Sequence, residues 1–235
     1  MKKKTKIIII ISSALAFVVT VLLLTFLVFI PLYEQSQWQK KVKAYYDAKI
    51  VLYEQENEYY ADGEVDVAFI GDSLTDGYDL QRYYPQYVTA NRGIGGDTTF
   101  GVQDRLQVSL YDLQPKVVVM LIGANNFSTM LENYEEILIS MKENLPNSQI
   151  VLLSLTAMSK EWGKNNAIAC YNNVVIEKLA SKYDYEFIDM FTPLYDLETG
   201  GLYDEYTTDG GHFTAKGYEV VTEQITPVLA KILGE

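Results

Sequence analysis

The feature that most restricts what this chain can fold into is an apolar run close to its amino terminus. Between residues 7 and 30 there are 24 residues without a charged side chain. As an α-helix this run would be about 36 Å long, which is enough to cross the hydrocarbon layer of a membrane. The run therefore predicts a transmembrane helix over residues 7–30, preceded by a basic tail over residues 1–6.

Two interpretations of the apolar run stay open, an uncleaved anchor and a cleaved signal peptide. The apolar region of a signal peptide is usually about 7–15 residues long and ends near small residues. Here the run is longer and ends at Ile30 and Pro31, which favours the anchor. Four lysines precede it, and the positive-inside rule keeps such a tail in the cytoplasm. We expect a single-pass protein of the cell membrane whose remaining chain lies outside the cytoplasm.

Composition excludes some classes of partner. The 19 basic and 31 acidic residues give a formal net charge of -12. An acidic domain repels phosphate backbones, so nucleic acid is not an expected partner. Cys170 and His212 are the only cysteine and histidine, which argues against a zinc site built from several such residues. Cys170 follows three apolar residues and is interpreted as a small core residue.

Residues 31–63 are expected to form a juxtamembrane helix or linker. Their apolar and aromatic side chains have a helical spacing that Lys49 and Glu56 interrupt, and Asp62 and Gly63 then break the pattern. The region could be a stalk, pack on the following domain or lie at the membrane surface. We expect one domain of ordinary size over residues 64–235.

Within residues 64–235, short runs rich in β-branched residues alternate with helical patterns. The candidate strands are residues 65–70, 87–91, 117–122, 149–155 and 185–189, and the candidate helices lie near residues 98–110, 132–145, 162–183 and 214–233. Alternation of this kind predicts an α/β fold, a five-stranded parallel sheet with helices on both faces. Ligands of such sheets bind beyond the carboxyl ends of the strands.

Polar segments follow three of these strands, and a fourth lies near the carboxyl terminus. Ser73 follows the first strand in Gly-Asp-Ser-Leu, Gly96 lies in a glycine-rich turn after the second, and Asn125 follows the third in Gly-Ala-Asn-Asn. Asp209 and His212 stand three residues apart. A serine needs a neighbouring base to become a nucleophile, and His212 is the only imidazole in the sequence. Taken alone, each segment is also typical of a plain turn, with Asp97 or Thr98 capping a helix.

Taken together, the four segments resemble the SGNH hydrolases, the GDSL-type esterases and lipases, from about residue 65 to the carboxyl terminus. The similarity is greatest to the branch of platelet-activating factor acetylhydrolases and many bacterial acylhydrolases, which share Gly-x-Asn-Asn. Many other members have Asp where Asn126 stands. The resemblance implies a flavodoxin-like three-layer fold. It also implies a catalytic triad of Ser73, His212 and Asp209. The oxyanion hole that goes with this triad would be formed by Ser73, Gly96 and Asn125.

The same resemblance implies a serine carboxylic-ester hydrolase that works through an acyl-enzyme and needs no cofactor or metal. A site outside the cell lies near wall polysaccharides and lipids, so we expect a carbohydrate O-acetyl ester as substrate. The alternative is a short-chain lipid or lysophospholipid ester. An O-acyltransferase and a non-catalytic binding module on the same fold are further alternatives. Loop tyrosines are expected to stack on sugars or simply to pack: Tyr78, Tyr83, Tyr84, Tyr87, Tyr195, Tyr203 and Tyr206. The sequence does not indicate an oligomeric state.

Overall fold

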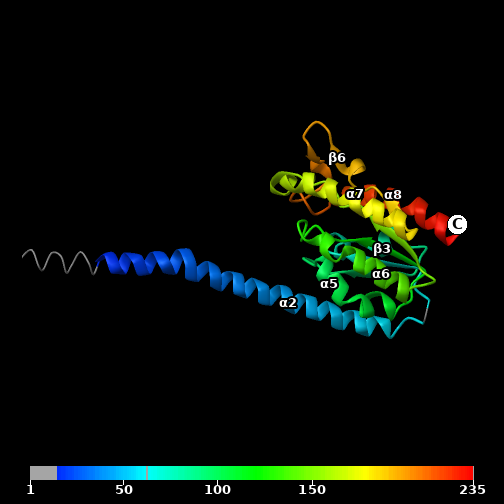
Figure 1. Cartoon of the computed structure of the whole chain (residues 1–235), viewed down its shortest axis with the longest axis horizontal. Helices are drawn as coiled ribbons and strands as arrows, with labels where there is room; N and C mark the ends of the chain where they lie inside the picture. The colour runs from blue at the N-terminus through cyan, green and yellow to red at the C-terminus, as the bar shows by residue number, and fades with distance from the viewer. Residues whose placement is uncertain (1–14, 62, 235) are drawn as a thin grey trace, which may run out of the picture. The chain divides into compact units, whose positions relative to one another are not determined.

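The computed structural model describes residues 15–61 and 63–234 (Figure 1). These residues form two compact units, which divide between Ala48 and Lys49. In the first unit the chain is helical from Leu15 onward, through a π-helix η1 (Thr25–Phe29) into α2 (Ile30–Asn57). This helix is apolar and long enough to cross a membrane, and a signal sequence can also have these properties. Residues 7–14 of the predicted span and the basic tail lie outside the described residues.

A parallel sheet of five strands forms the centre of the second unit, which confirms the predicted fold class. Its strands stand in the order β2-β1-β3-β4-β5, and each pairs in parallel with its neighbours. The strands are β1 (Val67–Gly71), β2 (Thr89–Gly93), β3 (Val117–Leu121), β4 (Gln149–Leu153) and β5 (Glu186–Ile188). In the register, Gly71 lies beside both Gly93 and Leu121, so these three strands end at the same edge.

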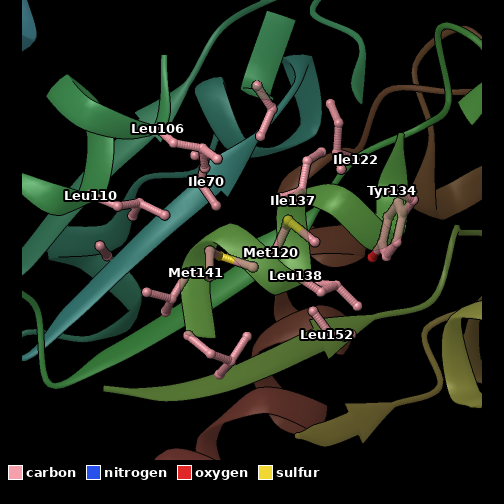
Figure 2. Packing of buried hydrophobic residues seen from close by; sticks show 14 of the residues in the cluster. Ile70, Leu106, Leu110, Met120, Ile122, Tyr134, Ile137, Leu138, Met141 and Leu152 are labelled. Atoms are coloured by element: carbon pink, nitrogen blue, oxygen red, sulfur yellow. The ribbon is translucent and has the colours of Figure 1, made fainter. Parts of the chain in front are cut away.

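Helices cover both faces because successive strand residues point to opposite sides. On one side the strands contact α5 (Thr99–Asp104), a π-helix η2 (Gln107–Tyr111), α6 (Tyr134–Asn144) and α7 (Asn166–Tyr183). On the other side they contact α3 (Ser73–Asp76), α4 (Leu80–Tyr83) and α8 (Ala215–Leu233). Figure 2 shows the first of these two cores, where strand and helix side chains meet: Ile70, Met120, Leu152, Leu110, Ile137 and Met141.

Several elements differ in detail from the prediction. The helix expected near residues 98–110 is divided into α5 and the π-helix η2, and α7 is preceded by a 3₁₀-helix η4 (Lys160–Asn165). A two-stranded antiparallel sheet of β6 (Tyr195–Asp196) and β7 (Gly201–Leu202) was not predicted, because strands of two residues have no visible periodicity. Further 3₁₀-helices are η3 (Met130–Glu132), η5 (Thr192–Leu194) and η6 (Asp204–Tyr206).

The interpretation of Cys170 as a core residue was wrong. Cys170 lies on α7 with its thiol exposed, whereas its neighbour Ala169 is fully buried. An α-helix turns by about 100° per residue, so an apolar neighbour does not place a side chain on the same face.

The second unit begins inside α2, earlier than the domain start expected at residue 64. The compact unit runs from Lys49, so residues 49–57 belong to it. Tyr53, in the middle of this stretch, is only 1% exposed. The last turns of α2 are therefore part of the domain core and not a free linker.

Candidate active site

Ser73 lies at the edge of the sheet where β1, the strand between β2 and β3, ends. β1 ends at Gly71, and Ser73 is the first residue of the short helix α3. The carboxylate of Asp72 caps this helix by accepting a hydrogen bond from the amide of Leu74 at 3.1 Å. The tight transition from strand to helix leaves the Ser73 hydroxyl at the rim, where ligands of parallel sheets bind.

His212 and Asp209 approach Ser73 from a loop that precedes α8. The Ser73 Oγ lies 3.0 Å from the His212 Nε2, although 139 residues separate the two in sequence. The other ring nitrogen, Nδ1, lies 2.7 Å from the Asp209 Oδ2. The three side chains thus form one continuous chain of hydrogen bonds.

Hydrogen bonds within the loop fix the orientation of this pair. The Asp209 Oδ1 accepts from the amides of Gly211 and His212 at 2.9 and 2.8 Å, and the Thr207 hydroxyl donates to the His212 carbonyl at 2.8 Å. Burial alone would raise the pKa of Asp209. The hydrogen bonds from His212 and Gly211 have a larger combined effect in the opposite direction and hold the pKa well below its ordinary value. A carboxylate only accepts, so in the neutral form of the imidazole Nδ1 carries the proton and Nε2 presents a lone pair to Ser73.

Gly96 and Asn125 follow the two strands that flank β1. Gly96 has a φ of +81°, a backbone conformation that favours glycine. Asn125 uses one amide hydrogen to donate to the Asp97 carbonyl at 2.8 Å, which leaves its second hydrogen for a ligand. Across residues 15–61 and 63–234, the amides of Ser73 and Gly96 donate no hydrogen bond to a protein acceptor.

Asn126, where many related sequences have Asp, joins the loop after β3 to the first residue of α5. Its Nδ2 donates to the Thr99 hydroxyl at 2.9 Å, and its Oδ1 accepts from the Thr99 amide at 3.3 Å. An amide can donate and accept at once, which suits both contacts. Of the two residues expected to cap the following helix, Thr98 is the cap, since its hydroxyl accepts from the Gly101 amide.

Sequence reasoning missed a buried ion pair below these loops. The guanidinium of Arg105 contacts the carboxylate of Asp97 at 2.8 Å, and their side chains are 1% and 3% exposed. Arg105 also donates to the carbonyls of Arg92 and Gly71, at 2.8 and 3.0 Å. It therefore ties the ends of β1 and β2 to the loop that contains Gly96. The two residues lie eight positions apart across a helix start, a spacing that gives no signal in the sequence.

A pocket opens over the Ser73 hydroxyl. Its lining includes Asn125 and His212 together with residues that sequence reasoning did not identify: Leu74, Ala124, Thr156, Met158, Trp162 and Gly211. Trp162 is 43% exposed, and its indole lies close to Gly211, the residue before His212. Among the loop tyrosines, Tyr78, Tyr84 and Tyr87 are buried, and the described lining of this pocket contains no tyrosine.

Two aspartates flank the serine, and both hold the local backbone. Asp72 is 1% exposed, and its burial raises the pKa to about 7. Its second oxygen, Oδ2, has no hydrogen-bond partner among the described residues. Asp76 accepts from the Gly95 amide at 2.9 Å. Within the described part of the chain, no group of three or more His, Cys, Asp or Glu residues is arranged to hold a metal ion.

Comparison with known proteins shows the family to which the sequence is similar. The model of the GDSL-like Lipase/Acylhydrolase family matches residues 69–220. Platelet-activating factor acetylhydrolase IB subunit alpha2 of Rattus norvegicus is 28% identical over 193 residues, 74% of this chain and 80% of the relative.

Solved structures share the fold. One from Streptococcus pneumonia, whose description names a platelet activating factor, has a TM-score of 0.76 at 27% identity and covers 84% of this chain and 98% of its own. The acetylxylan esterase Axe2 from Geobacillus stearothermophilus has a TM-score of 0.60 at 16% identity, over 72% of this chain and 95% of its own. At that identity the second likeness concerns the fold alone.

Proposed function

Because this chain belongs to the GDSL-like lipase and acylhydrolase family, we propose that it is a serine carboxylic-ester hydrolase with Ser73 as nucleophile. In this proposal His212 is the general base, and Asp209 orients the imidazole and stabilises its charged form. The observation that supports these roles is the chain of hydrogen bonds from Asp209 through His212 to Ser73, with distances of 2.7 and 3.0 Å.

In the first half of the reaction, the Ser73 Oγ attacks the ester carbonyl carbon while its proton moves to the His212 Nε2. The carbonyl oxygen becomes an oxyanion that the amides of Ser73 and Gly96 and the Asn125 side chain can receive. Removing one donor of this kind typically costs about 3–4 kcal/mol of transition-state stabilisation. The intermediate collapses when imidazolium His212 gives its proton to the leaving alcohol, and the acyl group stays on Ser73.

In the second half, water takes the place of the alcohol. Neutral His212 removes a proton from the water as its oxygen attacks the acyl carbon, and a second tetrahedral intermediate forms in the same oxyanion hole. Its collapse breaks the bond to Ser73, whose oxygen regains the proton from His212, and a carboxylic acid leaves. Every proton passes through Nε2, so this chemistry needs no further titrating group.

For the substrate we propose an acetyl ester on a carbohydrate. The exposed indole of Trp162 stands beside His212 and offers an apolar ring on which a sugar can stack. A relative with 28% identity carries acetylhydrolase in its name, which favours a short acyl group. A short-chain lipid ester is the second candidate, since that relative is named for a platelet-activating factor.

We further propose that the domain stands outside the cytoplasm on a single-pass anchor. In this proposal the chain consists of a cytoplasmic tail over residues 1–6, a membrane-spanning helix over residues 7–30, a connecting segment and the hydrolase domain. An exposed apolar helix from Leu15 supports the anchor. The lysines before the span support the orientation.

The test compares the full-length protein with Ser73→Ala and His212→Ala in detergent micelles. The substrates are acetylated oligosaccharides and p-nitrophenyl esters of graded chain length. We expect each variant to lose at least about 10³-fold in kcat and the double variant to be scarcely worse, because members of a triad act as one unit. A His212→Ala protein with near-normal kcat/KM would show that the assigned base is wrong. Product analysis with an added sugar acceptor separates hydrolysis from acyl transfer.

A further inference from the structure

The last turns of α2 contact the backbone that carries the proposed oxyanion hole. Residues 93–97, named here the oxyanion loop, begin at the last residue of β2 and include Gly96. Lys49, Tyr53, Glu56 and Asn57 all reach this loop or the residues that hold it. These four residues lie in the same compact unit as the active site.

Tyr53 makes the most direct of these contacts. Its hydroxyl donates to the carbonyl of Gly93 at 2.5 Å, and the side chain is 1% exposed. Burial raises the pKa of the phenol far above its ordinary value, so the hydroxyl keeps its proton and remains a donor at any working pH. Gly93, the first residue of the oxyanion loop, is thus hydrogen-bonded to α2.

Lys49 acts through the carboxylate of Asp76, which connects the helix of Ser73 with the oxyanion loop. Its ammonium contacts the Asp76 Oδ1 at 2.7 Å, with side-chain exposures of 19% and 15%. The Asp76 Oδ2 accepts from the amide of Gly95, the residue before Gly96. Asp76 is also the last residue of α3, the helix that begins with Ser73. One partly buried ion pair therefore joins α2 to the helix of the nucleophile and to the oxyanion loop.

Glu56 and Asn57 hold Arg92, the residue immediately before the loop. The Arg92 guanidinium donates to the carboxylate of Glu56 at 2.5 Å and to the Asn57 side chain at 3.0 Å. It also stacks over the Tyr53 ring, 4.6 Å from the ring centre. The end of β2 is thereby fixed on its outer side by α2, while Arg105 binds the Arg92 carbonyl from within.

We propose that the last turns of α2, residues 49–57, are a positioning element of the oxyanion hole, which sets the Gly96 amide relative to Ser73. This inference depends on the proposed esterase function. The helix that leads out of the apolar segment then has a second role beyond connecting the domain to a membrane. Its loss should lower kcat and leave KM nearly unchanged, because oxyanion contacts form only in the transition state.

The test is Tyr53→Phe and Lys49→Met in the full-length protein, assayed on p-nitrophenyl acetate. Phe keeps the packed ring and removes only the donor to Gly93. Tyr185→Phe is the matched control, since its hydroxyl also donates to a backbone carbonyl, that of Leu138 at 3.2 Å. Lys231→Met is the control for the ion pair, because Lys231 contacts Glu186 at 2.7 Å on the surface.

We expect each α2 variant to lose about 10-fold in kcat with KM changed less than twofold, below the loss for removal of a whole oxyanion donor. Lys49→Arg should recover most of the Lys49→Met loss. Both controls should keep the parental kcat. All assays run at a temperature at which circular dichroism shows every variant folded, so that loss of folded protein cannot produce the effect.

Unchanged kcat in both α2 variants, or a rise in KM alone, would overturn the positioning role. Equal losses in the α2 variants and their controls would overturn it as well. Ser73→Ala separates this failure from that of the proposed function. If Ser73→Ala abolishes turnover and the α2 variants do not alter kcat, only the role of α2 is wrong, whereas an active Ser73→Ala protein contradicts the esterase mechanism itself.

Discussion

The carboxyl group of Asp72, next to the proposed nucleophile, is buried, and burial disfavours its charged form. Its pKa is raised from 3.8 to about 7, chiefly because burial removes the carboxylate from water. The folded protein therefore binds a proton that the unfolded chain has released between about pH 4 and 7. The contribution of Asp72 to the free energy of unfolding therefore falls as the pH rises through this window and becomes level above it.

We expect Asp72→Asn to remove this dependence. The Asn side-chain oxygen can still accept from the Leu74 amide, so the helix cap is retained. The variant should match the parent near pH 4 and exceed its free energy of unfolding by up to about 4 kcal/mol at pH 8, the equivalent of about three pKa units. Urea unfolding at both pH values measures the difference. A constant difference across pH would mean that Asp72 does not titrate in this range.

At the scale of elements, Arg105 joins two strand ends to the loop that follows β2. We expect Arg105→Met to lower the free energy of unfolding by about 3–5 kcal/mol, because it leaves the buried Asp97 carboxylate without its partner. Burial raises the pKa of Asp97 and Arg105 lowers it, so the loss should be smaller at acid pH, where Asp97 can become neutral. The measurement is urea unfolding of parent and variant at pH 5 and 8.

A matched surface change serves as the control for Arg105. Lys182→Met removes an ion pair with Glu135 whose members are 60% and 41% exposed. Exposed pairs contribute about 0–1 kcal/mol, so this variant should stay close to the parent. A loss of under about 1 kcal/mol for Arg105→Met would show that the buried pair does not hold the strand ends.

The strands could be predicted because burial on both faces leaves a trace in the sequence. β3 and β4 appear as nearly continuous apolar runs, and only their ends shift by one or two residues. The end of α2 could not be predicted in the same way. Lys49 and Glu56 interrupted its apolar spacing, yet they form ion pairs with Asp76 and Arg92. A charge with a distant partner cannot be distinguished from a solvated one without the fold.

The same limit, that contacts made only in the fold leave no pattern in the sequence, applies to the candidate active site. Ser73, Gly96 and Asn125 follow strand ends within short motifs, and parallel topology brings strand ends to one edge, so sequence reasoning could select them as candidates. Thr156, Met158 and Trp162 follow β4 without any motif and line the pocket only because of how that segment folds back. Trp162 in particular lies in a 3₁₀-helix that has no distinctive pattern.

For the whole molecule, the decisive question is whether the apolar helix remains part of the mature chain as a membrane anchor or is cleaved off as a signal peptide. We expect the full-length protein to remain in the membrane fraction after washing with alkaline carbonate, since the exposed apolar helix is long enough to cross the hydrocarbon layer. Immunoblotting of pellet and supernatant checks this. A soluble mature chain that begins beyond residue 30 would identify the run as a cleaved signal.

The exposed thiol on α7 gives the chain a ready-made attachment point. Cys170 is the only cysteine in the sequence, and it does not line the pocket over Ser73. A maleimide dye or spin label would therefore mark each molecule once, without any engineered cysteine. Burial and the nearby Asp189 carboxylate raise the pKa of this thiol, and the thiolate is the reacting form, so labelling should quicken as the solution is made more alkaline.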